Sequence, residues 1–331
     1  MVKSAKSDII FFEAFDEEQK LLRKLCPSHI RAEYTSQTIQ ESKMKDVPAA
    51  LVSIRTQSKI PFGWAPALKG ILTRSTGFDH VLDYRDQTKC EAALGYLPSY
   101  CARAVAEQAI LMMLALWRKL KTQQQCFHFF CRDGLTGLEC QDKKMLVVGV
   151  GNIGSEIVDI ARGLHMKVAG VDIDRKLPSL EYTDLTSGLS WADVVVCALS
   201  LTQETKEMLS YETLRRVKTG TIFINIARGE ISPLKDLKRL LDEQILGAVG
   251  LDVYDDEEAL ARWLRSDKKD DPDENIKVAL ELKDHPNVIF TPHNAFNTQE
   301  ALGRKAEQTM ESAVSFLTQQ VFPFPVPETQ S

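Results

Sequence analysis

The sequence predicts an α/β protein made of two domains with parallel sheets. Strand-like apolar runs alternate with helix-like runs along almost the whole chain, which is typical of such sheets. A glycine-rich turn, Gly-Val-Gly-Asn-Ile-Gly at 149–154, directly follows one apolar run, a pattern typical of a Rossmann-like or flavodoxin-like domain. The 331 residues suffice for two domains, and an apolar content of 44% supports a core in each.

The first hundred residues contain four apolar runs with helical stretches between them. We expect strands at 8–13, 50–55, 70–76 and 93–98 and helices at 17–25 and 79–91. A helical pattern at 103–121 is apolar over most of its circumference, which predicts a buried helix, possibly one that lies between subunits.

The strand that leads into the glycine turn opens at Met145, and from there strands alternate with helices to the end of the second domain. Its further strands are expected at 167–172, 193–199, 221–226, 248–253 and 287–291. A last helix at 298–320 precedes a proline-rich tail and is expected to rejoin the first domain, while a charged stretch at 267–275 reads as a solvated insertion. The first predicted domain therefore consists of residues 1–100 and 297–331, and the second of residues 101–296. Ligands of such folds bind beyond the carboxyl ends of strands, so the site is expected in the cleft between the domains.

Each part of the glycine turn suits the binding of a dinucleotide. Gly149 allows the tight turn, Gly151 lets the backbone approach a pyrophosphate, and Gly154 lets the next helix pack closely. Asp172 ends the following apolar run, where its carboxylate can bind the ribose hydroxyls and repel a 2′-phosphate. The combination predicts an NAD site, whereas the glycines alone could be a structural turn.

Composition narrows the class of protein. The net charge of −5 is spread along the chain, which argues against a nucleic-acid surface, and no apolar run approaches the ~20 residues of a membrane span. The polar N-terminus and the seven cysteines without a C-x-x-C pair favour a cytoplasmic protein. Cys126 and Cys131 flank His128 in an aromatic stretch, for which packing in the core or at a helix end is favoured over a metal site.

Three further motifs place polar side chains at or just beyond strand ends. Arg228 lies in Asn-Ile-Ala-Arg-Gly-Glu, Asp252 in Gly-Leu-Asp-Val-Tyr with Glu257 in the loop after it, and His293 in Thr-Pro-His-Asn-Ala-Phe. A guanidinium can bind the carboxylate and polarise the ketone of a 2-oxo acid, and an imidazolium can protonate the alkoxide that hydride transfer creates. A Glu257–His293 hydrogen bond would favour the imidazolium and orient the ring. Each residue alone could be structural, but together they indicate a dehydrogenase.

These motifs resemble those of the D-isomer-specific 2-hydroxyacid dehydrogenase family from about residue 45 to 320, and the D-lactate dehydrogenase branch most of all. Arg-Ser-Thr-Gly-Phe-Asp-His (74–80) and Tyr-Cys-Ala-Arg-Ala-Val-Ala-Glu (100–107) also match. The resemblance implies two domains that close over a small 2-oxo or 2-hydroxy acid, a homodimer formed through the nucleotide domain, and Arg228, Glu257 and His293 as the catalytic set.

The resemblance also implies binding residues. For the substrate these are the N–H groups of Thr76 and Gly77, the pocket and hinge residue Tyr100, and Arg55, which could bind a distal anionic group or form a surface salt bridge. For the cofactor they are Asn152, Ile153, Asp172, Leu199, Ser200, Thr205, Ile226, Ala227 and Asp252, together with the three glycines of the turn.

Some departures from the family leave alternatives open. Ser200 stands where proline is common, Gln108 where histidine is common, and Arg175 and Lys176 could accept the 2′-phosphate of NADP. Glu257 argues against formate dehydrogenases, which have Gln there. An NAD(H)-sensing corepressor-like protein, or a dehydrogenase for phosphite or a phosphorylated hydroxy acid, are the alternative functions.

Overall fold

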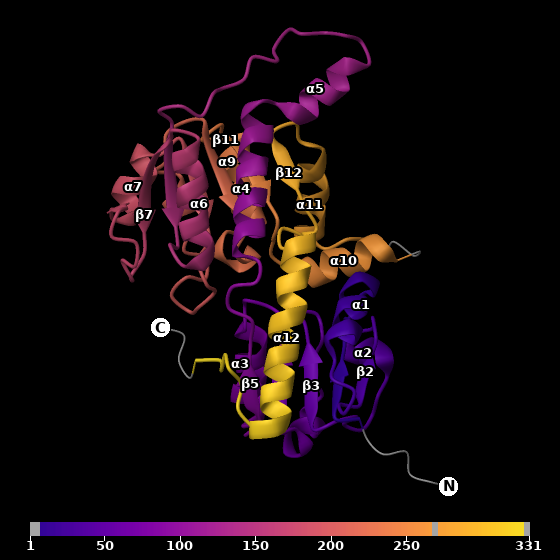
Figure 1. The fold of residues 1–331 in the computed structure, drawn as a ribbon. Helices are drawn as coiled ribbons and strands as arrows, with labels where there is room; N and C mark the ends of the chain where they lie inside the picture. Colours follow the sequence, from indigo (N-terminus) through magenta and orange to yellow (C-terminus); the bar gives the residue numbers. More distant parts are fainter. Residues whose placement is uncertain (1–6, 267–270, 328–331) are drawn as a thin grey trace. The chain divides into compact units, whose positions relative to one another are not determined.

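The computed structural model describes residues 7–266 and 271–327, and the chain forms two compact units. Unit 1 comprises Met1–Cys101 and Asn297–Ser331, and unit 2 comprises Ala102–Phe296. The positions of the two units relative to one another are not determined (Figure 1).

Unit 1 is built on a parallel five-stranded sheet in the order β2-β1-β3-β4-β5. The four predicted strands are confirmed, and the fifth, β2, was not foreseen because Ala-Glu-Tyr has no apolar run. Strands β1, β3 and β4 are buried throughout, as expected when helices cover both faces of a sheet. The strands are β1 (Ile9–Phe11), β2 (Ala32–Tyr34), β3 (Leu51–Ile54), β4 (Gly70–Thr73) and β5 (Ala93–Gly95). The helices are α1 (Asp16–Leu25), α2 (Ile39–Ser42), η1 (Phe62–Ala67), α3 (Asp79–Thr88) and α12 (Gln299–Gln319).

Helix α12 returns the chain to unit 1, as the sequence predicts. It packs against α1 and β4, and Figure 1 shows it running along the sheet of this unit. Its buried face consists mainly of small residues and Met310 and Phe316, but it also includes the charged side chain of Lys305. The proline-rich tail then pairs with the sheet through a single bridge from Gly95 to Pro325.

Unit 2 is built on a parallel seven-stranded sheet in the order β12-β11-β10-β9-β6-β7-β8. Strand order reverses between β6 and β9, which is the usual place for a dinucleotide in such sheets. The strands are β6 (Lys144–Val148), β7 (Lys167–Val171), β8 (Glu181–Tyr182), β9 (Val194–Cys197), β10 (Thr221–Asn225), β11 (Leu246–Leu251) and β12 (Val288–Phe290). The helices are α4 (Ala102–Trp117), α5 (Leu120–Phe127), α6 (Asn152–Gly163), α7 (Leu185–Trp191), α8 (Tyr211–Leu214), η2 (Gly229–Ile231), α9 (Leu234–Asp242), α10 (Glu257–Arg265) and α11 (Glu274–Asp284).

One predicted segment differs from the structure. The single helix expected at 103–121 is wrong, because Lys119 adopts a left-handed conformation (φ 51°) that separates α4 from α5. Of the charged stretch predicted to be solvated, 267–270 lie outside the described residues, and 271–275 are exposed or half-buried, as predicted. Residues 274–275 begin α11, and the side chain of Asp273 caps the N–H of Ile276. The predicted burial of α4 is confirmed, since most of its side chains pack against α6 and the sheet.

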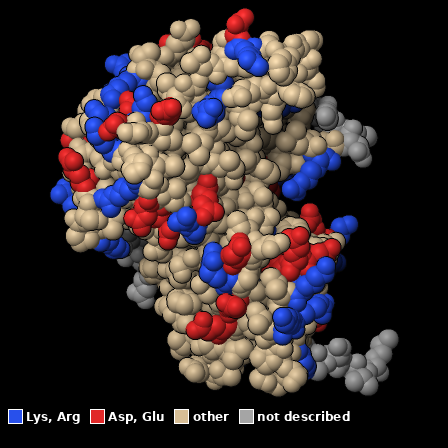
Figure 2. Space-filling view, turned by 45° about the horizontal axis from the view of Figure 1, so that its top comes forward, with Lys and Arg blue, Asp and Glu red and all other residues tan. Residues whose placement is uncertain are grey.

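The surface mixes charges of both signs. Figure 2 shows Lys and Arg side chains interspersed with Asp and Glu on the face in view. Within the described residues, no helix is both long and apolar enough to cross a membrane.

Candidate active site

Three neighbouring strands of unit 2 carry the predicted catalytic residues at one edge. Strands β10, β11 and β12 are adjacent and parallel, so their carboxyl ends meet at the same edge of the sheet. Arg228 follows β10 and His293 follows β12. Asp252 comes directly after β11 rather than within it, and Glu257 is the first residue of α10 rather than a loop residue.

His293 and Glu257 form a direct side-chain contact. Nδ1 of His293 lies 3.0 Å from Oε1 and 3.1 Å from Oε2 of Glu257, and both side chains are about a third exposed, at 30% each. A carboxylate at Nδ1 fixes the tautomer and the ring orientation, which directs Nε2 away from Glu257. The pair can therefore donate or accept a proton at Nε2 while the carboxylate stabilises the charged ring.

Asp252 holds the loop that presents His293. It is buried, with 1% of its surface exposed, and its Oδ1 accepts hydrogen bonds from Oγ1 of Thr291 (2.5 Å) and N–H of Asn294 (2.9 Å). Its Oδ2 accepts one from N–H of Ala295 (3.0 Å). These bonds hold the backbone on both sides of His293, whose own φ of 50° is unusual for a residue other than glycine. The predicted contact of Asp252 with the cofactor stays a prediction.

Asn225 does the same for the loop of Arg228. It is fully buried, its Oδ1 accepts from N–H of Ala227 (2.9 Å), and its Nδ2 donates to O of Arg228 (2.9 Å) and to Oγ of Ser232 (2.8 Å). The sequence contains a signal for this role. Asn225 is a polar residue that directly follows the apolar run Ile-Phe-Ile at the end of β10. The guanidinium of Arg228 donates through Nη1 to O of Ala227 (2.8 Å).

The glycine turn has the shape that a dinucleotide needs. Gly149 adopts φ 94°, and a Cβ on Gly154 would lie 2.0 Å from O of Gly149, so neither tolerates a side chain. A Cβ on Gly151 would meet nothing within 4 Å, so the backbone is open to a ligand there. Helix α6 starts at Asn152, so its first N–H groups lack acceptors within the helix and point toward this space.

Strand β7, which follows the glycine turn and α6, is directly followed by Asp172, the acid predicted to bind ribose. Oδ2 of Asp172 accepts from N–H of Val150 (2.5 Å) and Oδ1 from N–H of Asp174 (2.8 Å), which ties the acid to the glycine turn. These residues fit an NAD molecule, with phosphates on the helix N-terminus and ribose hydroxyls at the carboxylate.

The other predicted cofactor residues lie at the ends of neighbouring strands. Thr205 bonds to O of Ser200 (2.7 Å) in the loop after β9, and this bond fixes the shape of the loop. The remaining positions follow β9 and β10 or begin α6: Leu199, Ile226, Ala227, Asn152 and Ile153.

In unit 1, the loop after β4 carries Thr76 and Gly77. Oγ of Ser75 donates to O of Gly77 (2.6 Å), and Oγ1 of Thr73 lies 2.6 Å from Oγ of Ser75 and 3.0 Å from Nε2 of His80. This chain of hydrogen bonds fixes the carbonyl of Gly77. Among the described residues, no acceptor takes a hydrogen bond from the N–H of Thr76 or Gly77, so both can bind an anion.

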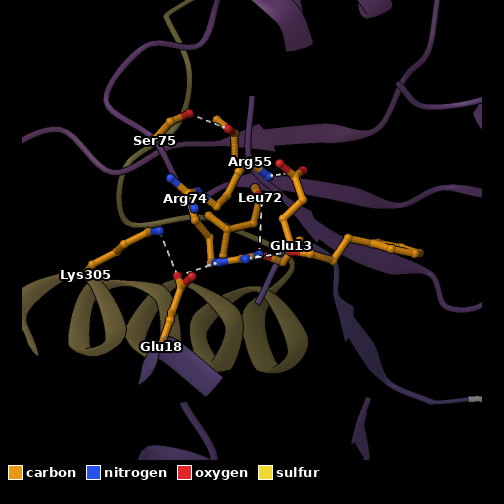
Figure 3. A network of polar contacts seen from close by, with 10 residues as sticks. Glu13, Glu18, Arg55, Leu72, Arg74, Ser75 and Lys305 are labelled. Atoms are coloured by element: carbon orange, nitrogen blue, oxygen red, sulfur yellow. Dashed lines mark hydrogen bonds and ion pairs between the residues drawn. The ribbon is translucent and has the colours of Figure 1, made fainter. Parts of the chain in front are cut away.

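A buried ionic cluster lies beneath this loop (Figure 3). Oε1 of Glu18 is 3.0 Å from Nε of Arg74 and 2.9 Å from Nζ of Lys305, and Arg74 and Lys305 are fully buried. Arg74 also donates to Oγ of Ser53 (3.0 Å) and to O of Phe12 (2.6 Å). The cluster therefore joins α1, β4 and α12, and none of its ionic partners was identified from the sequence.

The charges of the cluster are unequal. Burial disfavours ionised Glu18, but Arg74 and Lys305 together lower its pKa to about 2. Burial, followed by the charges of Arg55 and Arg74, lowers the pKa of Lys305 to about 7 even though Glu18 favours its charged form. Glu18 is thus kept ionised, whereas the charged form of Lys305 is disfavoured.

Tyr100 and Arg55 border this cluster. Tyr100 is 4% exposed, its carbonyl accepts from Nε of Arg304 (2.9 Å), and Nζ of Lys305 lies 5.8 Å from its ring centroid. Burial raises the pKa of Tyr100 well above its usual value, so its hydroxyl stays protonated. Arg55 is half-buried, and its guanidinium lies 5.5 Å from the ring centroid of Phe15.

Comparison with known proteins is consistent with this geometry. The family model for the NAD binding domain of D-isomer specific 2-hydroxyacid dehydrogenases matches residues 110–295. D-lactate dehydrogenase of Escherichia coli is 31% identical, over 74% of this chain and 75% of its own length. 2-Hydroxyacid dehydrogenase A of Aspergillus oryzae is 30% identical, over 96% of this chain and 91% of its own length. The structure of D-lactate dehydrogenase from Aquifex aeolicus with NAD and lactic acid superimposes with a TM-score of 0.85 at 28% identity, covering 96% of this chain and 98% of that one.

Proposed function

The chain belongs to the D-isomer-specific 2-hydroxyacid dehydrogenase family, a family of NAD-dependent oxidoreductases, and on that basis we propose that it interconverts a small 2-oxo acid and the D-2-hydroxy acid. Pyruvate and D-lactate are the first candidates, because the D-lactate dehydrogenases named above are among its relatives. The observation that carries this proposal is the 3.0 Å contact of His293 with Glu257 at the sheet edge.

We propose that His293 is the general acid and base. NAD(H) supplies or accepts the hydride at the substrate carbon. As the carbonyl oxygen gains negative charge during reduction, Nε2 of His293 donates a proton to it, and in the reverse direction Nε2 accepts that proton. Glu257, held at Nδ1, stabilises the imidazolium and keeps the ring in place.

Arg228 and the loop after β4 would bind the substrate. The planar guanidinium of Arg228 can bind a carboxylate and polarise the adjacent ketone, which a lysine cannot do with the same geometry. The N–H groups of Thr76 and Gly77 in unit 1 are proposed to bind a carboxylate of the substrate, with Ser75 keeping the loop in shape through Gly77. Tyr100 is proposed to line the pocket.

The cofactor roles follow the geometry of unit 2. We propose that the turn at Gly149, Gly151 and Gly154 binds the pyrophosphate with Asn152 and Ile153, and that Asp172 binds the adenosine ribose. The contacts nearer the two ends of NAD would come from Leu199, Ser200, Thr205, Ile226, Ala227 and Asp252.

We propose that the protein is a homodimer formed through unit 2. The resemblance to the family supports this proposal, and apolar side chains of the kind found at protein interfaces are exposed on α4 and at the start of α5. The exposed fractions are 55% for Leu111 and 45% for Leu120. A mass of one subunit in light scattering at micromolar concentration would contradict the dimer.

A panel of 2-oxo acids tests the activity. Purified protein is expected to oxidise NADH with at least one acid among pyruvate, glyoxylate, hydroxypyruvate, 2-oxoglutarate and branched or aromatic 2-oxo acids. NADPH is expected to be a poorer substrate, because Asp172 repels a 2′-phosphate. The absorbance of NADH is followed with each acid and without any acid. NADH binding with no turnover of any acid would contradict the dehydrogenase and favour the NAD(H)-sensing alternative.

Arg55 is proposed to bind a second anionic group on the substrate. Its guanidinium adds to the positive charge of Arg74 and Lys305, and it lowers the pKa of Lys305. For a dicarboxylic 2-oxo acid, Arg55→Gln is expected to raise KM about 10-fold or more, which corresponds to loss of one charge-assisted hydrogen bond. KM for pyruvate should stay unchanged, and Arg55→Lys should recover part of the loss. Equal effects on both acids would assign Arg55 to the fold rather than to the substrate.

A further inference from the structure

The end of α5 presents two cysteines on the surface of unit 2. Cys126 lies in the last turn of α5, and Cys131 follows a short stretch in which Phe127, Phe129 and Phe130 are exposed. The sequence favours two arrangements for this segment, packing in the apolar core or packing at a helix end. The core arrangement is therefore wrong, and the position at a helix end is confirmed. We call residues 126–131 the aromatic turn.

Backbone hydrogen bonds bring the two cysteines together. N–H of Cys131 donates to O of Cys126 (3.3 Å), and N–H of Phe130 donates to O of Phe127 (3.2 Å). Phe130 adopts a left-handed conformation with φ 52°. This is the Schellman arrangement, in which the first and last of six residues lie side by side and their side chains commonly touch. The thiols do interact: the hydrogen bond with Cys131 raises the pKa of Cys126.

We propose that Cys126 and Cys131 are a reversible dithiol–disulfide pair and the site of oxidative modification in this protein. A disulfide needs Cα atoms within about 7 Å and Cβ atoms that face one another. The Schellman bonds join the backbones of the two residues directly, so the bond can form without unfolding α5. Cys131 is exposed and can meet an oxidant from solution.

A low-molecular-weight disulfide is the oxidant that the chemistry requires. The thiolate of Cys131 attacks one sulfur of that disulfide, forms a mixed disulfide and releases the first thiolate. Cys126 then loses its proton and attacks the sulfur of Cys131, which forms the Cys126–Cys131 bond and releases the second thiol. Two protein thiols are oxidised and one small disulfide is reduced to two thiols, so atoms and electrons balance.

The other cysteines differ from this pair. Cys90, Cys101 and Cys197 are buried, and burial raises the pKa of Cys101 and, to about 12, that of Cys197. Cys26 and Cys140 are half-buried. In the part of the chain that the structure describes, which includes all seven cysteines, only Cys126 and Cys131 have another thiol as a neighbour.

Peptide mapping tests the pair in the intact native protein. Because Lys121 precedes and Arg132 ends the segment, trypsin releases both cysteines in one peptide, 122–132, with no other cysteine. The protein is equilibrated with glutathione disulfide, quenched by alkylation at low pH and digested. We expect the peptide to escape alkylation and to lose two hydrogens, about 2 Da, with the aromatic turn oxidised before any other cysteine.

Matched variants separate the pair from general oxidation. Cys131→Ser should leave Cys126 alkylated or as a mixed disulfide with glutathione, with no loss of two hydrogens. Cys140→Ser should oxidise as the wild type does. A doubly alkylated peptide 122–132 after full equilibration, or a disulfide between subunits, would overturn the proposal. The readout is a peptide mass, so it does not depend on whether the proposed dehydrogenase activity is found.

Discussion

His293→Asn is expected to lower kcat for 2-oxo acid reduction by about 10³-fold, because general acid–base catalysis contributes about 10²–10⁴-fold. Asparagine has a similar size but cannot supply a proton at neutral pH. The Kd for NADH should stay within about twofold of the wild type, since the glycine turn and Asp172 lie on other strands. Steady-state kinetics with the best acid of the panel and fluorescence titration with NADH measure the two quantities.

His285→Asn is the matched control. His285 lies at the end of α11, where burial lowers its pKa, and its Nδ1 accepts from N–H of Asn287 (3.1 Å). This variant should keep kcat within about twofold, as a substitution away from the reacting groups does. Glu257→Gln should give a smaller loss than His293→Asn, because the amide still bonds to Nδ1 but no longer stabilises the imidazolium. Equal activity of the wild type and His293→Asn would remove His293 from the catalytic set.

The sequence predicts the framework of unit 2 well because local patterns determine it. A strand that runs into a glycine turn requires residues without side chains at Gly149 and Gly154, and the structure shows backbone in the space that a Cβ would need. The end of each strand is marked by a change from apolar to polar residues, which is why Arg228, Asp252 and His293 could be placed at one edge. The break at Lys119 could not be predicted, because a lysine in the left-handed conformation has no sequence signal.

The residues that support the candidate site were harder to predict than the polar residues at the strand ends. Asp252 reads as a cofactor contact in the sequence, yet its oxygens bind the backbone at Asn294 and Ala295. Such roles depend on loops that meet only in the folded chain. The same holds for Glu18 and Lys305, which lie nearly 300 residues apart in the sequence and read there as ordinary surface charges on helices. Long-range ionic contacts of this kind leave no periodic pattern.

Glu18→Gln is expected to destabilise the protein by about 3–5 kcal/mol, the usual loss when one partner of a buried ionic group is removed. The change leaves Arg74 and Lys305 buried beside one another without a carboxylate. Glu17→Gln, an exposed substitution on the same helix, should change the free energy of unfolding by less than about 0.5 kcal/mol. Urea denaturation followed by circular dichroism measures the free energy of unfolding of both variants. An equally small change in the two variants would show that the ionic cluster contributes nothing to stability.

The pH dependence identifies which charge is responsible. The pKa of Glu18 is lowered to about 2 from 4.5, so its stabilisation is complete above pH 4.5 and is lost as the pH falls through 2. The difference between the wild type and Glu18→Gln should therefore shrink across that window. Lys305 acts at the opposite end of the pH range. Its pKa is about 7 in the folded protein and 10.5 for an ordinary lysine, so the unfolded chain binds more protons between these two values. Wild-type stability therefore increases from this group as the pH rises from 7 to 10.5.

Lys305→Met should abolish the rise in stability between pH 7 and pH 10.5, because methionine fills a similar space without a charge. The remaining Arg74–Glu18 pair keeps its counter-charge. The double variant Glu18→Gln/Lys305→Met should recover part of the stability lost in Glu18→Gln, since only one buried cation is then left without a carboxylate. Strictly additive effects would contradict coupling between Glu18 and Lys305. Coupling, by contrast, would mean that α1 and α12 are held together by one carboxylate placed beneath the loop of Thr76 and Gly77.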